Sequence, residues 1–231
     1  MSILSDVTLI KRNTAPTHIW ERPATEGSVY YWSTVEDISF YARPMHTKEQ
    51  DEYLIENPPM VAPFSAEQHR VDEHGNKTVS WGTSSYGYDV RMARDFKIFT
   101  NVRNGMIDPL NPDPGCFVEH TGDYCIIPPN SYILGHTVET FDIPRDVMVV
   151  CLGKSTYARL AAVVNVTPIE PGFKGQVVIE IANCSTLPLK VYANQGIAQF
   201  LFLKGDRPCM TSYADRDGKY QNQAGVVTAR L

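Results

Sequence analysis

Short apolar runs separated by turn residues follow one another from about Val79 to the end of the chain. The runs are rich in Val, Ile, Tyr, Phe and Thr and are bounded by Pro, Gly, Asn or Asp, a pattern that indicates β-strands. The clearest predicted strands are Tyr124–Ile127, Tyr132–Val138, Val147–Leu152, Ala161–Val166, Val177–Ile181 and Ile197–Leu203. Many short strands in succession predict a mainly β fold that closes as a barrel or jelly roll.

The first third of the chain has a different pattern. Met1–Arg12 and Lys48–Leu54 are compatible with helices, and the polar stretch His69–Lys77 predicts a surface turn. We therefore expect a single domain over residues 1–231, in which residues 13–78 form an N-terminal insertion that decorates the β core.

The overall charge narrows the classes of partner. The formal net charge is -5, which disfavours a surface that wraps long nucleic acid but allows a local pocket for a mononucleotide. No uninterrupted apolar stretch is long enough to span a membrane, and the N-terminus lacks the features of a signal peptide. We expect no nucleic-acid or membrane partner and a cytoplasmic location.

The cysteines indicate neither a disulfide framework nor a zinc knuckle, because their number is odd and no pair forms C-x-x-C. We expect all of them to be buried, reduced thiols: Cys116, Cys125, Cys151, Cys184 and Cys209.

Candidate chemistry first appears directly after the predicted strand Val147–Leu152. The segment Gly153–Arg159 supplies backbone amides, one Lys, two hydroxyls and one Arg, which together suit a phosphate-bearing ligand. Lys154-Ser155 resembles the end of a P-loop, but the earlier glycine of that motif is absent, so we reject a P-loop.

A carboxylate lies within a second predicted strand, Gln176–Ala182. Alternation places Val177, Ile179 and Ile181 on one face and Glu180 on the other. A carboxylate in an otherwise apolar strand must be paired or hydrogen-bonded, or its pKa must rise. From the pattern alone, a structural ion pair, for example with Arg159, and a functional acid both remain open.

The C-terminal segment contains Tyr213 and the polar, glycine-bearing stretch Lys219–Gly225. A frayed end is the usual interpretation of such a terminus, and a cover over a bound ligand is the alternative.

Taken in this order, the segments resemble dCTP deaminases of the trimeric dUTPase-like superfamily. Gly153–Arg159 resembles the R/K-S-S-x-A-R motif, and Asn165–Gly175 followed by Val178–Glu180 resembles V-T-P-L-E-P-x-W-x-G-x-x-T-L-E. Further matches are Leu4–Asp6, Ser84–Arg91, Ile126–Asn130, Tyr192–Gln199 and Gly218–Gln223. The resemblance is nearly continuous from about Val79 to Leu231.

The resemblance implies a distorted jelly-roll homotrimer with active sites at the subunit interfaces. It implies that Glu180 is the catalytic glutamate and that Ser155 and Arg159 hold the attacking water. The substrate contacts that it implies are Lys154, Thr156, Tyr157, Ala158, Pro168, Glu170, Phe173, Val178, Ile179, Gln199, Tyr213, Lys219 and Gln223.

The same resemblance divides these contacts along the nucleotide. Glu170 corresponds to the carboxylate that binds the sugar 3′-hydroxyl, and Phe173, where many relatives have Trp, to the aromatic that packs against deoxyribose. The triphosphate contacts are Lys154, Thr156, Tyr213, Lys219 and Gln223. Magnesium is expected to be carried by the triphosphate rather than by the protein, and dTTP is a plausible inhibitor.

The implied reaction is the zinc-independent hydrolysis of dCTP to dUTP and ammonia. Zinc-dependent nucleobase deaminases use H-x-E and P-C-x-x-C ligands, and this sequence contains neither pattern. Without zinc to activate the water, Glu180 is expected to take a proton from the water and deliver it to the base, and Arg159 is expected to keep Glu180 ionised.

Two alternatives remain beside this function. The first is a bifunctional dCTP deaminase–dUTPase that releases dUMP and pyrophosphate, although such relatives usually carry Asp at the position of Glu170. The second is a non-catalytic nucleotide-sensing trimer with the same fold. The complete set of Ser155, Arg159 and Glu180 favours an enzyme.

Overall fold

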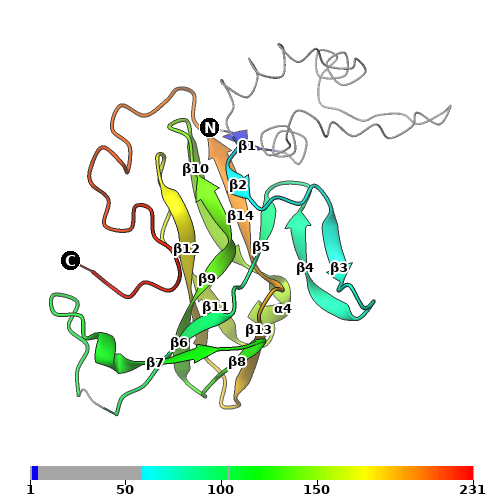
Figure 1. Ribbon diagram of the computed structural model, residues 1–231, viewed down its shortest axis with the longest axis vertical. Coiled ribbons are helices and arrows are strands. Elements are labelled where there is room, and N and C mark those ends of the chain that lie inside the picture. Colours follow the sequence, from blue (N-terminus) through cyan, green and yellow to red (C-terminus); the bar gives the residue numbers. More distant parts are fainter. Residues whose placement is uncertain (1, 5–58, 103–104, 231) are drawn as a thin grey trace.

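Two six-stranded sheets and one two-stranded sheet make up the fold in the computed structural model, which describes residues 2–4, 59–102 and 105–230 (Figure 1). The first sheet contains β1 (Ser2–Ile3), β3 (Gln68–Val71), β4 (Lys77–Thr83), β5 (Tyr88–Arg91), β10 (Val147–Gly153) and β14 (Gly196–Lys204). The second contains β2 (Val61–Ala62), β6 (Asp95–Phe99), β7 (Phe117–Thr121), β9 (Ser131–Asp142), β11 (Ala162–Asn165) and β12 (Lys174–Asn183). β8 (Tyr124–Ile127) and β13 (Leu189–Tyr192) form the third. The prediction of a mainly β fold is confirmed.

Helical structure is sparse in the described part of the chain. The 3₁₀-helix η1 (Pro114–Cys116) precedes β7, and the single-turn helix α4 (Ser155–Ala158) lies between β10 and β11. β10 continues through Gly153 and leaves no room for the glycine loop of a P-loop, which agrees with its rejection.

The two large sheets enclose the hydrophobic core. Val177, Ile179 and Ile181 of β12 are buried on one face, as the alternation predicted, and the residues between them are only partly buried. Phe141 of β9 and Phe200 of β14 meet within the core with ring centroids 5.1 Å apart. One face of β12 is therefore committed to the core, and the other face, which carries Glu180, is available for a site.

Several expectations for the first third of the chain need correction. β2 pairs with β9, and the β3–β4 hairpin joins the sheet of β5, so residues 61–78 are part of the two main sheets. The turn expected over His69–Lys77 covers only the residues between β3 and β4. Ser2–Ile3 is a strand paired with β14, whereas the rest of Met1–Arg12 beyond Leu4 and the helix expected over Lys48–Leu54 lie outside the described residues.

All five cysteines are free thiols, as expected, but they are not all buried. Cys116 and Cys125 are buried, Cys151 and Cys209 are partly buried, and Cys184 is exposed because it follows β12 on the surface. Among the described residues, the structure contains no helix of the length and apolarity needed to cross a membrane.

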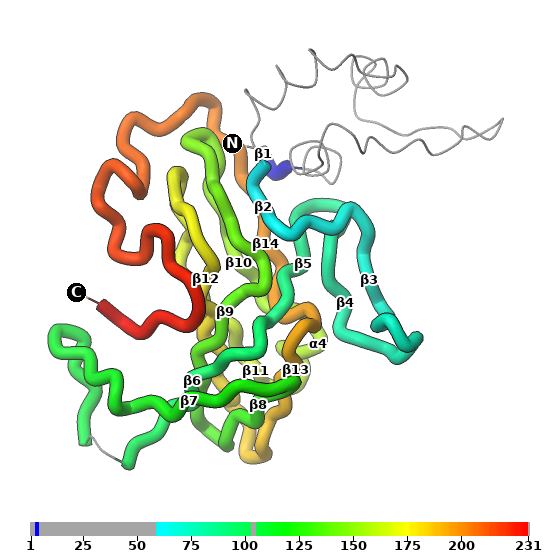
Figure 2. Tube along the Cα trace, viewed as in Figure 1, coloured from blue at the N-terminus to red at the C-terminus, as the bar shows by residue number. Residues whose placement is uncertain are grey.

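The chain after β14 does not fray. In Figure 2 it turns back and runs beside β12. There Gln176 N donates to Gln223 O at 2.9 Å, and Asn222 N donates to Lys174 O at 2.7 Å. The interpretation of this segment as a loose end is therefore wrong.

Candidate functional site

A cavity of about 430 Å³ lies on the face of β12 that points away from the core. Its lining comes from β6, β7, β9 and β12, the segment 106–116 between β6 and β7, the turn before β12 and the C-terminal segment. The predicted site residues that it brings together are Pro168, Glu170, Phe173, Val178, Glu180, Tyr213 and Gln223.

Glu180 is the chemically unusual group of this cavity. Its Oε2 atom is buried and has no hydrogen-bond partner. Burial raises the pKa of this carboxyl from 4.5 to about 7, with an opposing contribution from its own backbone N–H. Arg159 does not pair with it within one chain, because the hydrogen bond that the Arg159 guanidinium makes goes to Ser155 O at 3.3 Å. Among the described residues, Glu180 therefore has no ion-pair partner, and the group can exchange a proton near neutral pH.

The turn before β12 supplies an aromatic wall and a second carboxylate. Phe173 is 6% exposed, and its ring centroid lies 5.9 Å from that of Tyr213. Glu170 forms an ion pair with Arg216, whose part in the site the sequence analysis missed. The turn is tight because Gly172 adopts a φ of 84°, which favours glycine. An aromatic face beside a carboxylate suits a sugar ring with a free hydroxyl.

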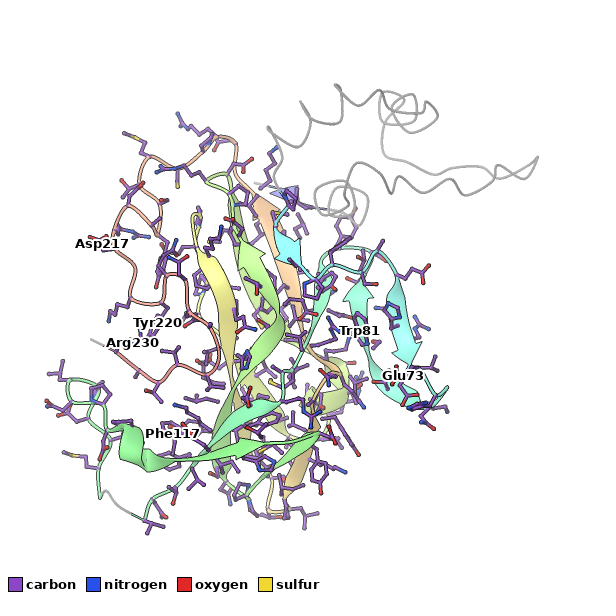
Figure 3. The ribbon with its side chains drawn as sticks, in the orientation of Figure 1. Glu73, Trp81, Phe117, Asp217, Tyr220 and Arg230 are labelled. Atoms are coloured by element: carbon purple, nitrogen blue, oxygen red, sulfur yellow. The ribbon has the colours of Figure 1, made fainter. Side chains whose placement is uncertain are left out.

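The C-terminal segment closes one end of the cavity. Tyr220 N donates to Tyr213 Oη at 3.0 Å, and Gln223 Nε2 donates to Gln176 O at 2.7 Å. The carbonyl oxygen Oε1 of Gln223 is buried without a partner. Figure 3 shows Tyr220 and Arg230 close together in this segment, where Arg230 N donates to Tyr220 Oη at 3.2 Å.

The remaining predicted residues lie elsewhere. Lys219 is in the C-terminal segment, where Nζ donates to Arg230 O at 3.2 Å, and Ile179 is fully buried on the core face of β12. The others gather around α4, outside the cavity lining, and are Lys154, Ser155, Thr156, Tyr157, Ala158, Arg159 and Gln199. We call these seven residues the α4 group.

The α4 group presents an exposed polar surface on a fixed base. Ser155, Thr156, Ala158 and Arg159 are exposed, whereas Tyr157 is 3% exposed and anchors the helix.

Two residues of the α4 group are already engaged by neighbouring segments. Lys154 Nζ lies 2.5 Å from Oδ2 of the buried Asp89, another residue that the sequence analysis did not single out. Gln199 Nε2 donates to Ser84 Oγ at 2.7 Å and to Tyr86 O at 3.1 Å. The Lys154–Asp89 pair thus fixes the start of α4.

Comparison with known proteins identifies the family. The family model described as dCTP deaminase-like matches residues 61–205. This chain belongs to the dCTP deaminase-like family. It is similar to the dCTP deaminases of Paraburkholderia xenovorans strain LB400, at 56% identity, and of Xanthomonas oryzae pv. oryzae strain PXO99A, at 55%. Each match spans 177 residues, 77% of this chain and 94% of the relative.

Two solved structures are also similar to this chain. One is a 2′-deoxycytidine 5′-triphosphate deaminase from Agrobacterium tumefaciens, with a TM-score of 0.43 and 19% identity, covering 53% of this chain and 40% of that chain. The other is the native dUTPase of EIAV, with a TM-score of 0.37 and 17% identity, covering 54% of this chain and 80% of that chain.

Family membership begins earlier in the chain than the motifs suggested. The matched region starts at Val61 rather than near Val79, in agreement with the pairing of β2 to β9 and of the β3–β4 hairpin to β5. The sequence analysis missed these strands because β2 has two residues and β3 is largely polar.

Proposed function

We propose that this protein is an enzyme that hydrolyses dCTP to dUTP and ammonia. The observation that carries the proposal is Glu180, a carboxyl group with a pKa of about 7 inside a cavity of a dCTP deaminase-like fold. General acid–base catalysis is most effective when the pKa of the catalytic group lies near the working pH. A proton shuttle without zinc needs such a group.

The proposed reaction begins when Glu180 accepts a proton from a water molecule that attacks C4 of cytosine. Glu180 passes this proton to the ring nitrogen N3 as the C4–O bond forms, which avoids a negative charge on the ring. Glu180 then takes the second proton of the water from the C4 hydroxyl and delivers it to the exocyclic amine, the C4–N4 bond breaks as the C4 carbonyl forms, and ammonia leaves. The buried Oε2 of Glu180, which has no competing hydrogen bond, is the atom that we assign to this transfer.

The proposed binding of the nucleotide follows the lining of the cavity. Phe173 would pack against deoxyribose, and Glu170 would accept a hydrogen bond from the 3′-hydroxyl. No Lys or Arg side chain is among the residues that line the cavity within the described ranges, so the triphosphate needs cations from elsewhere. Magnesium would travel with the triphosphate, and we assign it no protein ligand.

The separation of the α4 group from the cavity supports a homotrimer with shared active sites. Glu180 Oε2 has no partner among the described residues of its own chain, and Ser155 and Arg159 are exposed outside the cavity. In a cyclic trimer, the α4 group of one subunit can meet the cavity of the next subunit. Arg159 of the neighbour would then orient the attacking water, and Thr156 would contact the triphosphate.

Mixed trimers test this arrangement directly. We expect Glu180→Gln and Arg159→Ala to fold normally and to be almost inactive when each is assembled alone. Co-assembled in equal amounts, they should regain about a quarter of wild-type activity, because about one site in four then combines an intact Glu180 with an intact neighbouring Arg159. Full activity of Glu180→Gln alone would contradict the catalytic assignment, and the absence of any recovery on mixing would contradict the shared site.

Finer points of the proposal are the location and the regulation of the enzyme. We place the enzyme in the cytoplasm on the basis of its ordinary globular composition. We also propose that dTTP inhibits it, because dTTP shares the sugar and the triphosphate of the substrate. A parallel assay with dTTP as a competitor of dCTP tests the second point.

A further inference from the structure

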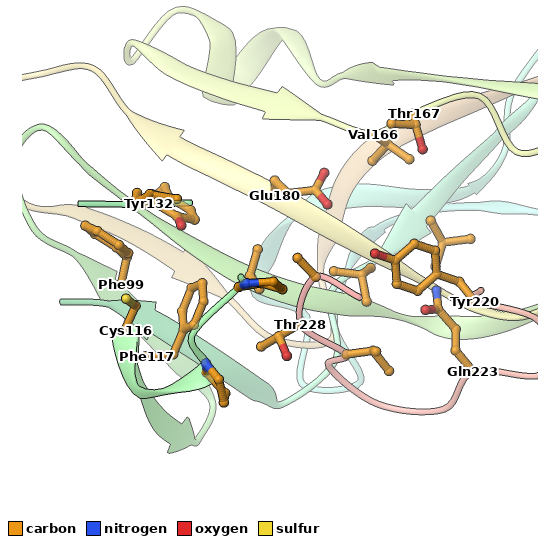
Figure 4. Close-up of a pocket in the computed structure, with 18 of the residues that line it drawn as sticks. Phe99, Cys116, Phe117, Tyr132, Val166, Thr167, Glu180, Tyr220, Gln223 and Thr228 are labelled. Atoms are coloured by element: carbon orange, nitrogen blue, oxygen red, sulfur yellow. The ribbon is translucent and has the colours of Figure 1, made fainter. Parts of the chain in front are cut away.

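The cavity continues past Glu180 into a chamber that the nucleotide contacts proposed above do not use. In Figure 4, Glu180 lies between two groups of labelled residues. Tyr220 and Gln223, from the C-terminal segment, lie on one side. Phe99, Phe117 and Tyr132 lie on the other side, and we call the space that they line the aromatic chamber.

The aromatic chamber is built from three adjacent strands. The rings of Phe99 and Tyr132 stack with centroids 4.8 Å apart, and Phe117 meets both edge-on at 6.0 and 5.9 Å. The cross-strand register fixes this contact, because Phe99 of β6 lies opposite Phe117 of β7. The rings hold one another in place, so the chamber is preformed and apolar.

The acidic residues near the chamber are engaged elsewhere. Apart from Glu170 and Glu180, the charged residues that line the described cavity are Asp108 and Asp113. Asp108 accepts hydrogen bonds from Leu110 N at 2.9 Å and Asn111 Nδ2 at 2.9 Å, and Asp113 accepts one from Gly115 N at 2.7 Å. Both side chains stabilise their own turns, so the chamber offers a ligand mainly aromatic surface.

In the proposed binding of the nucleotide, the exocyclic amine faces this chamber. The sugar is attached at N1, which lies opposite C4 across the cytosine ring. Phe173 lies 5.9 Å from Tyr213 between ring centroids, and Tyr213 Oη accepts a hydrogen bond from Tyr220 N, so a sugar held by Phe173 lies on the Tyr220 side of Glu180. With C4 at Glu180, the end of the base remote from the sugar then faces Tyr132 and Phe117. A group attached to N4 then enters the chamber, whereas a group attached to C5 points to the side of the line from N1 to C4.

We propose that the enzyme also hydrolyses dCTP that carries a small apolar group on N4, releasing a primary amine. The inference rests on the proposed deamination of dCTP. Water adds to C4, and Glu180 transfers one proton of the water to N3 and the other to the departing nitrogen. The C4–N4 bond breaks as the C4 carbonyl forms. N4-methyl-dCTP and water therefore yield dUTP and methylamine, with no further reactant. The aromatic chamber binds the alkyl group and accommodates the leaving amine.

The test compares dCTP, N4-methyl-dCTP, N4-ethyl-dCTP and 5-methyl-dCTP with the wild-type protein, measuring dUTP or its 5-methyl analogue by chromatography and the amine by derivatisation. We expect kcat/KM for N4-methyl-dCTP within roughly tenfold of that for dCTP, which is the low end of the effect of one methyl group in an apolar pocket. Turnover of dCTP without turnover of either N4-alkyl substrate would overturn the inference and leave the deaminase standing. No turnover of any substrate would overturn both.

Variants at Phe117 test the location of the alkyl group. Phe117→Leu should raise, and Phe117→Trp should lower, the ratio of kcat/KM for N4-ethyl-dCTP to that for dCTP, each by about tenfold. The ratio for 5-methyl-dCTP to dCTP serves as the control and should stay constant. If the 5-methyl ratio responds and the N4-ethyl ratio does not, the base lies in another orientation and the inference is wrong. The comparison of substrates with wild-type protein stands even where a variant fails to fold.

Discussion

Burial of Glu180 makes a quantitative prediction about stability. Its pKa rises from 4.5 to about 7 in the folded chain, and each pKa unit corresponds to about 1.4 kcal/mol, so ionising this group in the fold costs about 3 kcal/mol. Because the unfolded chain releases this proton first, the free energy of unfolding falls as the pH rises from about 4.5 to about 7. A glutamine at position 180 does not titrate and avoids this loss.

In the shared site proposed above, Arg159 of the neighbouring subunit should reverse most of that effect. A guanidinium beside a carboxylate lowers its pKa by roughly 1–3 units. In the Arg159→Ala background, burial acts alone, and Glu180→Gln should gain up to about 3 kcal/mol between pH 5 and pH 8. In the wild-type background, the gain over the same range should be less than half of this.

Urea denaturation at pH 5, 6, 7 and 8, at one protein concentration, measures both gains. Glu119→Gln is the control, because the side chain of Glu119 is 82% exposed, and this substitution should show no comparable pH dependence. A gain from Glu180→Gln that is equal at pH 5 and pH 8 would refute the role of burial. A pH-dependent gain that is the same in both backgrounds would refute the approach of Arg159 to Glu180.

Two further predictions concern the scaffold. Gly175→Ala should speed hydrogen exchange of the Gln176 amide at least about tenfold, because a Cβ at position 175 would lie 2.7 Å from Gln223 O. Gly75→Ala is the control, since a Cβ at position 75 would have nothing within 4 Å. Unchanged exchange in Gly175→Ala would contradict the docking of the C-terminal segment. In thermal unfolding, Arg91→Leu should destabilise the protein by about 3–5 kcal/mol at pH 8, because it leaves the fully buried Glu139, 2.8 Å from Arg91 Nε, as an unpaired charge. The loss should be smaller at pH 5, because burial raises the pKa of Glu139 and the carboxyl is more easily protonated there. Arg91→Leu with Glu139→Leu should restore much of the loss, and equal destabilisation at both pH values would contradict this explanation.

The strands and the face of Glu180 could be predicted because both follow from local patterns. Alternation along β12 separates Ile179 from Glu180 whatever the strand pairs with, and all six predicted strands are present with shifts at their ends. The motifs that carry the family resemblance are also local, and they place seven predicted residues around one cavity.

The partners of the predicted residues could not be read from the sequence. Lys154 was expected at the triphosphate, yet the fold places it 2.5 Å from Asp89, which is 65 positions earlier in the chain. The contacts among Phe99, Phe117 and Tyr132 depend on the register of three strands, which no local pattern fixes. An ion pair of Arg159 with Glu180 was one of the open interpretations, but the Arg159 guanidinium donates to Ser155 O at 3.3 Å, and the pattern of one chain does not indicate which side chain meets Glu180.

Product analysis with dCTP tests the central claim most directly. Purified protein is incubated with dCTP, magnesium and a zinc chelator, and nucleotides are resolved by chromatography. The account predicts that dUTP and ammonia accumulate in equal amounts and that Glu180→Gln forms neither. Accumulation of dUMP with pyrophosphate would instead establish the bifunctional enzyme, and a wild-type protein that leaves dCTP unchanged would contradict the account.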